Sequence, residues 1–185
     1  MREIFCLLAM VFGALAVLKF LYVVGTVSVL PKTKGALFVP TSGQKIKAIL
    51  DVLPLSSDMR VVDLGCGDGR FLRAVWRKYR IKAEGFEINL WAVFVARFLN
   101  FCWRTPAKVY RKDFFQVDLS RYDLVFCYLF PDLLLDLRAK LDREIREGAW
   151  LVSCNFPVPG WKPWKILQVG DPIFIYRKGF AERRS

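Results

Sequence analysis

The pattern of apolar and polar positions divides the chain into one unbroken apolar segment and a series of short strands and amphipathic helices. Residues 4–30 carry a single charge, Lys19, and would be apolar on every face of a helix. Such a helix spans about 40 Å, more than the roughly 30 Å of a bilayer's hydrocarbon core. An in-plane amphipathic helix needs a polar face, so the segment predicts a transmembrane helix.

A cleavable signal peptide is the alternative for this segment, because Ala14–Ala16 resembles a cleavage site. Cleavage there would leave a strongly apolar new terminus, which favours the membrane span. Lys19 would then snorkel toward a headgroup layer. Pro31 ends the segment, and the basic residues Lys32 and Lys34 favour the cytoplasmic side, although a basic residue at position 2 weakens that orientation.

From residue 35 onward, β-branched runs alternate with helical repeats. Thr41 or Ser42 N-caps a predicted helix over residues 44–52. Further helices are predicted after Gly69, over residues 90–103 and from Pro131. Strands are predicted in the run starting at Val61, at 81–87, 107–111, 123–129 and 149–155, with an antiparallel hairpin formed by 164–169 and 172–176. This alternation predicts an α/β fold with a largely parallel, Rossmann-like sheet.

The amino-acid composition limits the kinds of site that the chain can form. A chain of 185 residues is long enough for one domain with a real core. Its net charge of +12 fits a nucleic acid, an anionic membrane or neither. The five dispersed cysteines form no C-x-x-C pair, and histidine is absent, so we expect no metal site and no histidine base. The cysteines predict buried, reduced thiols in a reducing compartment.

A glycine-rich turn follows the first predicted strand, and its acids and glycines are Asp63, Gly65, Gly67, Asp68 and Gly69. Glycines let the backbone take a positive φ and let a ligand approach closely. The next helix adds unpaired N–H groups and a positive dipole end, which suit a nucleotide ligand that bears a carboxylate or another anionic group. A dinucleotide turn needs a third glycine at position 70, where the chain has arginine. A turn that binds nothing is the alternative.

This glycine spacing resembles motif I of class I S-adenosylmethionine (SAM) methyltransferases. The resemblance implies that Asp63 and the turn hold the methionine end of SAM. Glu87 lies 24 positions after Asp63, at the end of the second strand. An acid there accepts ribose hydroxyls, as in dehydrogenases also. In many methyltransferases an acid after the third strand bonds the adenine amino group and an apolar neighbour packs on the ring, which implies these roles for Asp113 and Phe114.

Other stretches resemble one narrower family, the small membrane-anchored protein-lysine methyltransferases that modify the c-subunit of ATP synthase or the adenine nucleotide translocase, with prokaryotic relatives. These stretches are the N-terminal span and residues 38–41, 62–70, 85–89, 113–115, 117–120, 130–131 and 156–161. The resemblance implies a trimmed seven-stranded SAM methyltransferase sheet, because no sixth helix fits between Asn155 and Trp164. It also assigns Thr41 to the cofactor pocket. The chain departs from the family at Asn155, where we expect a basic residue.

The resemblance predicts an anchor and basic juxtamembrane segment over residues 1–34 and a methyltransferase domain over 35–185, on the cytosolic or mitochondrial matrix side. The expected partners are a membrane and a protein that presents a lysine near the bilayer, with no nucleic acid. Open α/β sheets bind ligands at the carboxyl ends of their strands, so Tyr128 and Asn155 are the candidates for orienting the acceptor.

The acceptor lysine must lose a proton before the methyl group is transferred, and a dry site lowers the pKa of this lysine from about 10.4.

A lipid or quinone acceptor would explain the anchor equally well. An RNA acceptor would fit the basic charge, but the Asn-Pro-Pro-aromatic signature is absent after the fourth strand. A non-catalytic scaffold with a degenerate SAM fold is the remaining alternative.

Overall fold

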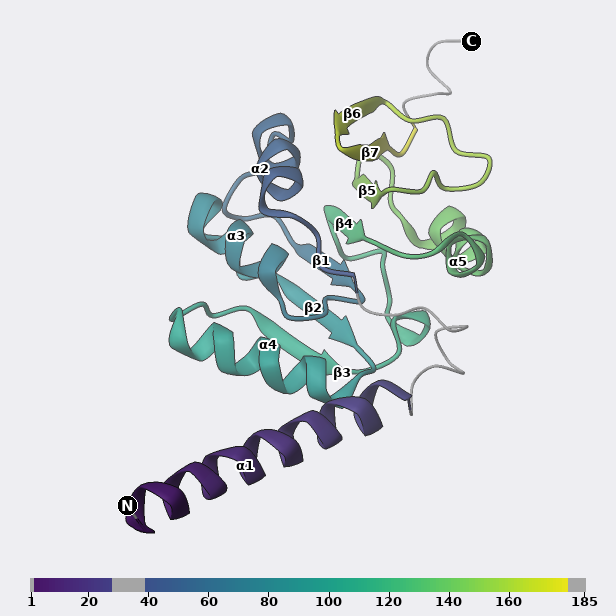
Figure 1. The fold of residues 1–185 in the computed structure, drawn as a ribbon. Helices are drawn as coiled ribbons and strands as arrows, with labels where there is room; N and C mark the ends of the chain where they lie inside the picture. The colour runs from purple at the N-terminus through teal and green to yellow at the C-terminus, as the bar shows by residue number, and fades with distance from the viewer. Residues whose placement is uncertain (1, 28–38, 180–185) are drawn as a thin grey trace.

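The computed structural model describes residues 2–27 and 39–179 and consists of an N-terminal helix and an α/β domain (Figure 1). The elements, in chain order, are α1 (Arg2–Val27), α2 (Gly43–Val52), β1 (Val61–Leu64), α3 (Arg70–Tyr79), β2 (Glu84–Glu87), α4 (Leu90–Cys102), β3 (Lys108–Arg111), η1 (Phe114–Gln116), β4 (Leu124–Cys127), α5 (Pro131–Glu144), β5 (Trp150–Cys154), β6 (Lys165–Val169) and β7 (Asp171–Arg177). The predicted juxtamembrane residues Pro31, Lys32 and Lys34 lie outside the described residues.

All seven strands form one sheet in the order β3-β2-β1-β4-β5-β7-β6. The first five strands of that order run parallel, and β7 runs antiparallel to both β5 and β6. The sequence-based prediction of a parallel sheet that ends in a hairpin is therefore confirmed. Several strands are shorter than predicted, since residues 81–83 and 128–129 lie outside them, whereas β7 extends one residue beyond its predicted run at each end.

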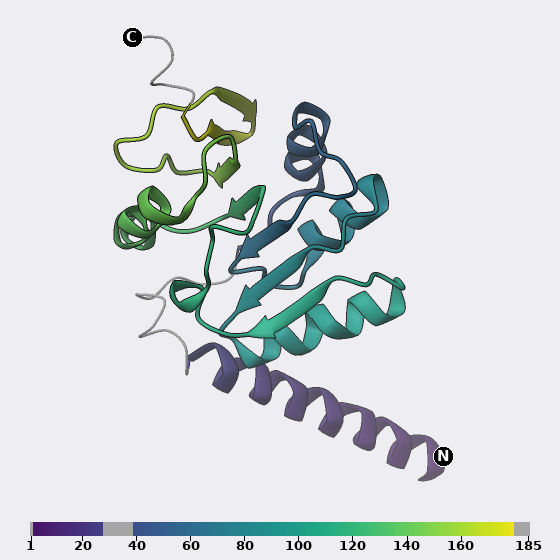
Figure 2. The same cartoon turned by 180° about the vertical axis from the view of Figure 1, so that it is seen from behind.

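Two hydrophobic cores cover the two faces of the sheet. Along β1, Val61 packs with helices α2, α3 and α4, whereas Val62 and Leu64 pack with α5. Figures 1 and 2 show these helices on opposite sides of the sheet. Strands that are buried on both faces are apolar at nearly every position, which explains the continuous β-branched runs in the sequence.

The N-cap of α2 is Ser42, one of the two predicted caps. Its hydroxyl accepts a hydrogen bond from the Lys45 backbone N–H at 3.3 Å, which satisfies one of the orphan donors of the first turn. Ile46, Ile49 and Leu50 are buried, so α2 packs onto the domain by the predicted apolar face. The helix is thereby fixed against α3 and the end of the sheet formed by β6.

Helix α1 is apolar along its length, and every side chain that the structure describes in it is exposed. The stretch Arg2–Phe20 has the length and composition of a membrane span, properties that an N-terminal signal sequence shares. The last part of α1 lies beside α4 in both views (Figures 1 and 2).

Three of the five cysteines, Cys66, Cys127 and Cys154, are buried free thiols, as predicted. Burial raises the pKa of Cys127 to about 12, so its thiol stays protonated at neutral pH. Cys6 and Cys102 are exposed, because they lie on the outward faces of α1 and α4.

Gly85 of β2 has no room for a side chain. A Cβ built there would lie 2.7 Å from the Cys66 Sγ and 2.7 Å from the Leu72 Cδ1. We expect Gly85→Ala to cost about 1–3 kcal/mol by overpacking and to lower the melting temperature by roughly 2–12 °C. Thermal unfolding in detergent, followed by circular dichroism, measures this change. Gly43→Ala is the control, because nothing lies within 4 Å of its Cβ position, and a loss no larger than the control's would contradict the clash.

Candidate functional site

The turn between β1 and α3 has the backbone that its glycines predict. Gly65, Gly67 and Gly69 adopt φ values of +76°, +52° and +76°. The N–H groups of Gly65 and Cys66 both donate to the Phe86 carbonyl, at 2.8 and 3.1 Å. The turn is thereby tied to the end of β2. Side chains at these φ values would be strained, so the glycines are required by the geometry.

Asp63 lies at the base of this turn and is almost completely buried. Burial first, and then the negative charges of Glu87 and Asp68, raise the pKa of its carboxyl well above the ordinary value. Within residues 2–27 and 39–179, this carboxylate accepts no hydrogen bond, and because no fully buried side-chain oxygen there lacks a partner, its oxygens keep some access to the surface of the site. A buried acid without donors costs free energy, so the position fits the cationic group of a ligand better than it fits an empty protein interior.

Glu87 stands at the end of β2, beside the turn. Its carboxylate accepts from the Gly67 N–H at 3.1 Å and from the Asn89 N–H at 2.8 Å. Burial raises its pKa, whereas these backbone donors act in the opposite direction. A carboxylate has about four lone-pair sites, so these backbone donors do not exhaust its capacity to accept from the hydroxyl groups of a ligand.

Asp68, which the sequence analysis places in the cofactor site, also has a protein partner. Its carboxylate forms an ion pair with the Arg70 guanidinium, with Nη2–Oδ2 at 2.8 Å. Burial by itself raises the pKa of Asp68, but the hydrogen bonds and charge of Arg70 outweigh burial and lower it. Arg70 also donates to the Thr41 carbonyl at 3.1 Å. Asp68 and the backbone of Thr41 are thus linked through Arg70, a role of Arg70 that sequence analysis missed.

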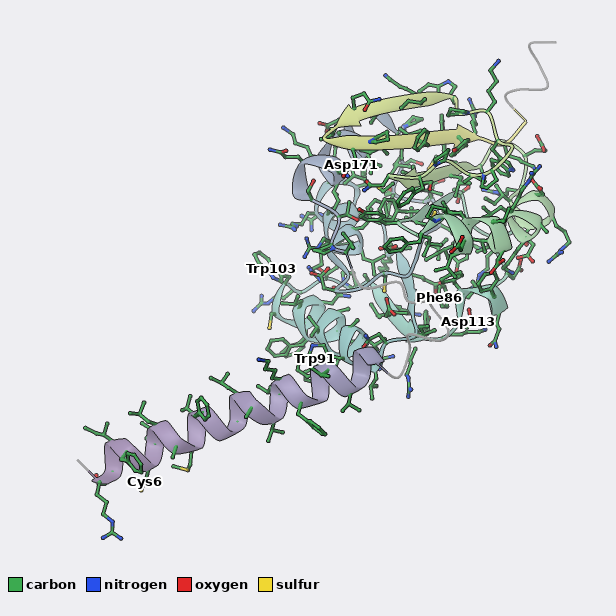
Figure 3. All side chains as sticks on the ribbon, turned by 45° about the vertical axis from the view of Figure 1, so that its right-hand side comes forward. Cys6, Phe86, Trp91, Trp103, Asp113 and Asp171 are labelled. Carbon is green, nitrogen blue, oxygen red and sulfur yellow. The ribbon has the colours of Figure 1, made fainter. Side chains whose placement is uncertain are left out.

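Asp113 and Phe114 follow β3 at the same carboxyl edge. The Asp113 carboxylate caps η1 by accepting from the Phe115 N–H at 3.0 Å. Phe114 is half-buried, and its ring centroid lies 4.9 Å from that of Phe115. Strand β3, which Asp113 follows (Figure 3), pairs with β2 so that Arg111 lies opposite Glu87. The two residues are therefore placed along the edge that begins with Asp63 and Glu87.

Tyr128 and Asn155 come together at the ends of β4 and β5. The Asn155 side-chain amide donates to the Tyr128 hydroxyl at 2.6 Å. It also donates to the Asp171 carboxylate at 3.1 Å, and Asn155 itself has a left-handed φ of +65°. Since β4 is the neighbour of β1, this pair lies on the sheet edge next to the glycine turn. Burial is the main cause that raises the pKa of Tyr128, so its hydroxyl stays neutral and protonated.

Lys45 completes this group and was not found from the sequence. Its ammonium group donates to the Asn155 Oδ1 at 2.5 Å and to the Asp171 Oδ2 at 2.8 Å. It also lies 5.7 Å from the centroid of the Tyr128 ring. Lys45 is only 6% exposed. The sequence did contain an indication of this role. Lys45 lies beside Ile46 on the apolar face of α2, where a buried charge needs a partner.

The arrangement offers an acidic, glycine-lined half and a hydroxyl–amide–ammonium half on one sheet edge. The described residues contain no group of three or more His, Cys, Asp or Glu side chains that would hold a metal ion. We call Lys45, Tyr128, Asn155 and Asp171 the acceptor cluster.

Comparisons with known proteins agree with this geometry. The family model described as the ANTKMT methyltransferase domain matches residues 63–165. The chain is 33% identical to a lysine N-methyltransferase of the ATP synthase c-subunit from Xenopus laevis, over 89% of this chain and 74% of the relative. It is 31% identical to a protein-lysine N-methyltransferase of Saccharolobus islandicus, over 72% and 85%.

A solved structure with a similar fold is an RNA methyltransferase from Salinibacter ruber in complex with S-adenosyl-L-homocysteine. Its TM-score is 0.72, its sequence identity is 26%, and the match covers 75% of this chain and 93% of that one.

Proposed function

The chain belongs to the ANTKMT methyltransferase family, and we propose that it methylates a lysine of a membrane protein while α1 holds it at the bilayer. It is a SAM-dependent protein-lysine N-methyltransferase. One observation carries the finer proposal. The family match over residues 63–165 contains both the glycine turn with Asp63, which accepts no hydrogen bond from the described residues, and the Tyr128–Asn155 pair.

We assign the cofactor's parts to the acidic half of the edge. Asp63 would accept from the amino group at the methionine end, because its buried carboxylate has no donor among the described residues. Glu87 would accept from the ribose hydroxyls with its remaining lone pairs. Asp113 would accept a hydrogen bond from the adenine amino group, and Phe114 would pack on the adenine ring. When bound, SAM supplies a methyl group on a positively charged sulfur.

The acceptor cluster would prepare the lysine nitrogen. Asn155 uses one lone pair of the Tyr128 oxygen, which leaves a second lone pair for an N–H of the incoming amine. That hydrogen bond would turn the nitrogen lone pair toward the methyl group, and alignment of this kind is a large part of the catalytic effect. The fixed positive charge of Lys45 disfavours a second cation nearby, so it favours release of the lysine proton to water before transfer.

Lys45→Met is expected to shift the pH profile of kcat/KM upward by about one unit. Removal of the cation raises the pKa of the acceptor lysine, so more alkaline solution is needed to obtain the neutral amine. Steady-state rates measured from pH 6 to pH 10 test this shift. Lys47→Met is the matched control on the exposed face of α2, and a Lys45→Met profile that superimposes on that of the control would contradict the role.

Two further observations support the anchoring of this protein in a membrane. Helix α1 has the length and apolar composition of a span, and the frog relative is named for a methylated component of ATP synthase. The catalytic domain would lie on the cytosolic or matrix side, where SAM is available. An acceptor lysine close to the bilayer would then lie at a fixed distance from the anchored catalytic domain.

The test is transfer from methyl-labelled SAM to native membranes that lack this gene, followed by separation of integral proteins, lipids and RNA. We expect label in the integral protein fraction. Label confined to lipid would favour a lipid or quinone acceptor, and label confined to RNA would favour the activity named for the Salinibacter neighbour. Either result would contradict the proposed substrate class.

A further inference from the structure

Helix α4 carries a stripe of large apolar side chains that no part of the described chain covers. The stripe consists of Leu90, Phe94, Phe98 and Phe101, spaced by four, four and three positions, which places them on one face. They are 56%, 59%, 56% and 81% exposed. The Phe94 and Phe98 ring centroids lie 6.4 Å apart, so the stripe is continuous. Aligned exposed aromatics of this kind mark an interaction surface, unlike single exposed leucines.

The surroundings of this stripe are basic. Residues 90–112 contain no aspartate or glutamate but five basic residues, Arg97, Arg104, Lys108, Arg111 and Lys112. Within the described part of the chain, none of the five forms a salt bridge. The Arg97 guanidinium donates to the Val109 carbonyl at 2.7 and 2.9 Å, which holds its charge beside β3. An aromatic stripe bordered by basic residues without acidic partners has the chemistry that anionic lipid headgroups recognise.

The stripe also adjoins the apolar helix at the N-terminus. The last part of α1 lies beside α4, and Figure 3 shows Trp91, in the first turn of α4, against α1. Any bilayer that receives α1 is therefore next to the stripe. We infer that α4 is a second membrane-binding surface, with its aromatic stripe in the headgroup boundary of an anionic bilayer and the basic residues of 97–112 on lipid phosphates.

This contact would orient the domain as well as tether it. Helix α4 starts directly after Glu87 and Asn89, at the carboxyl edge of the sheet that carries the candidate site. Contact along α4 would hold that edge at the membrane surface, where the acceptor proposed above would present its lysine. The orientation rests on the proposed function, whereas the lipid contact does not.

The experiment uses the full chain in vesicles of phosphatidylcholine with about 30% phosphatidylglycerol, an anionic composition of the kind that basic segments bind. An environment-sensitive fluorophore is attached to Phe101→Cys in a background of Cys6→Ser and Cys102→Ser. The control label is on Leu135→Cys of α5, an apolar side chain that is 60% exposed on the other face of the sheet. Nitroxide-bearing lipids should quench the label at position 101 about threefold more than the label at position 135.

Phe94→Asp with Phe98→Asp should reduce quenching at position 101 to the control level. The chain should stay on the vesicles through α1, and SAM affinity should be unchanged. Equal quenching at positions 101 and 135 would overturn the inference. Quenching that survives the double substitution would also overturn it. A blue-shifted but unquenched label would contradict it too, because protein, either α1 or a second chain, would then cover the stripe. Loss of methyl transfer with quenching intact would instead refute only the proposed function.

Discussion

Asp63→Asn is expected to abolish SAM binding and methyl transfer while raising the melting temperature of the cofactor-free protein. The two effects have one cause, a buried carboxylate without a donor among the described residues. The amide keeps the shape of the side chain and removes the buried charge. Relief of such a functional strain commonly gains about 0.5–2 kcal/mol, or a few degrees for a chain of this length.

The pH dependence of this effect has a defined sign. The pKa of Asp63 is raised in the folded chain, so its ionisation costs stability as pH rises from the ordinary carboxyl value, about 3.9, through the raised value. Asp63→Asn should remove that loss, and its stabilising effect should fade in acid. In the native chain, SAM affinity should weaken as pH falls through the same range, because a protonated Asp63 no longer attracts the amino group.

Calorimetric titration with SAM and thermal unfolding of the cofactor-free chain measure both effects. Glu147→Gln removes an exposed acid from the loop before β5 and is the matched control, for which we expect neither change. An Asp63→Asn protein that binds SAM with native affinity would exclude the assigned role of this residue. An unchanged affinity together with lowered stability would make Asp63 a structural residue.

Tyr128→Phe is expected to lower kcat by about 10- to 100-fold and to leave the SAM dissociation constant unchanged. The substitution removes only the hydroxyl that Asn155 holds at 2.6 Å and that we assign to the acceptor nitrogen. A hydrogen bond to a group that becomes charged contributes about 1.5–3 kcal/mol, which corresponds to that range of rates.

Single-turnover kinetics with saturating acceptor separates this effect from acceptor binding. Tyr110→Phe is the control, because its hydroxyl donates to Glu84 at 3.3 Å on an exposed part of β3, away from the acceptor cluster. An unchanged kcat with a raised KM would make Tyr128 a binding residue. If neither value changes, Tyr128 only packs against Lys45 and the core.

The order of strands and helices could be predicted from the sequence because the buried residues of each element follow a simple pattern along the chain. Apolar strands such as β1 are buried on both faces, and α5 buries Leu133, Leu134, Leu137 and Leu141 from one stripe. The carboxyl ends of parallel strands then meet at one edge. The proximity of Tyr128 to Asn155 therefore followed from topology alone.

The partners of these residues could not be predicted in the same way. Lys45 reaches Asn155 and Asp171 across 110 and 126 positions of sequence, and no local pattern encodes a contact of that range. The ion pair between Asp68 and the Arg70 guanidinium, at 2.8 Å, was also not predicted, because the glycine spacing of the turn carries no information about the direction of the Arg70 side chain. The assignment of Asp68 to the cofactor stays a prediction.

The identity of the methylated residue tests lysine methylation through this site. The full chain is incubated with methyl-labelled SAM and membranes that lack this gene, and the integral proteins are hydrolysed to amino acids. We expect the label to elute with methylated lysine and to be absent when Asp63→Asn replaces the native chain. Label in another amino acid, or equal labelling by the Asp63→Asn protein, would contradict a lysine methyltransferase that works through this site.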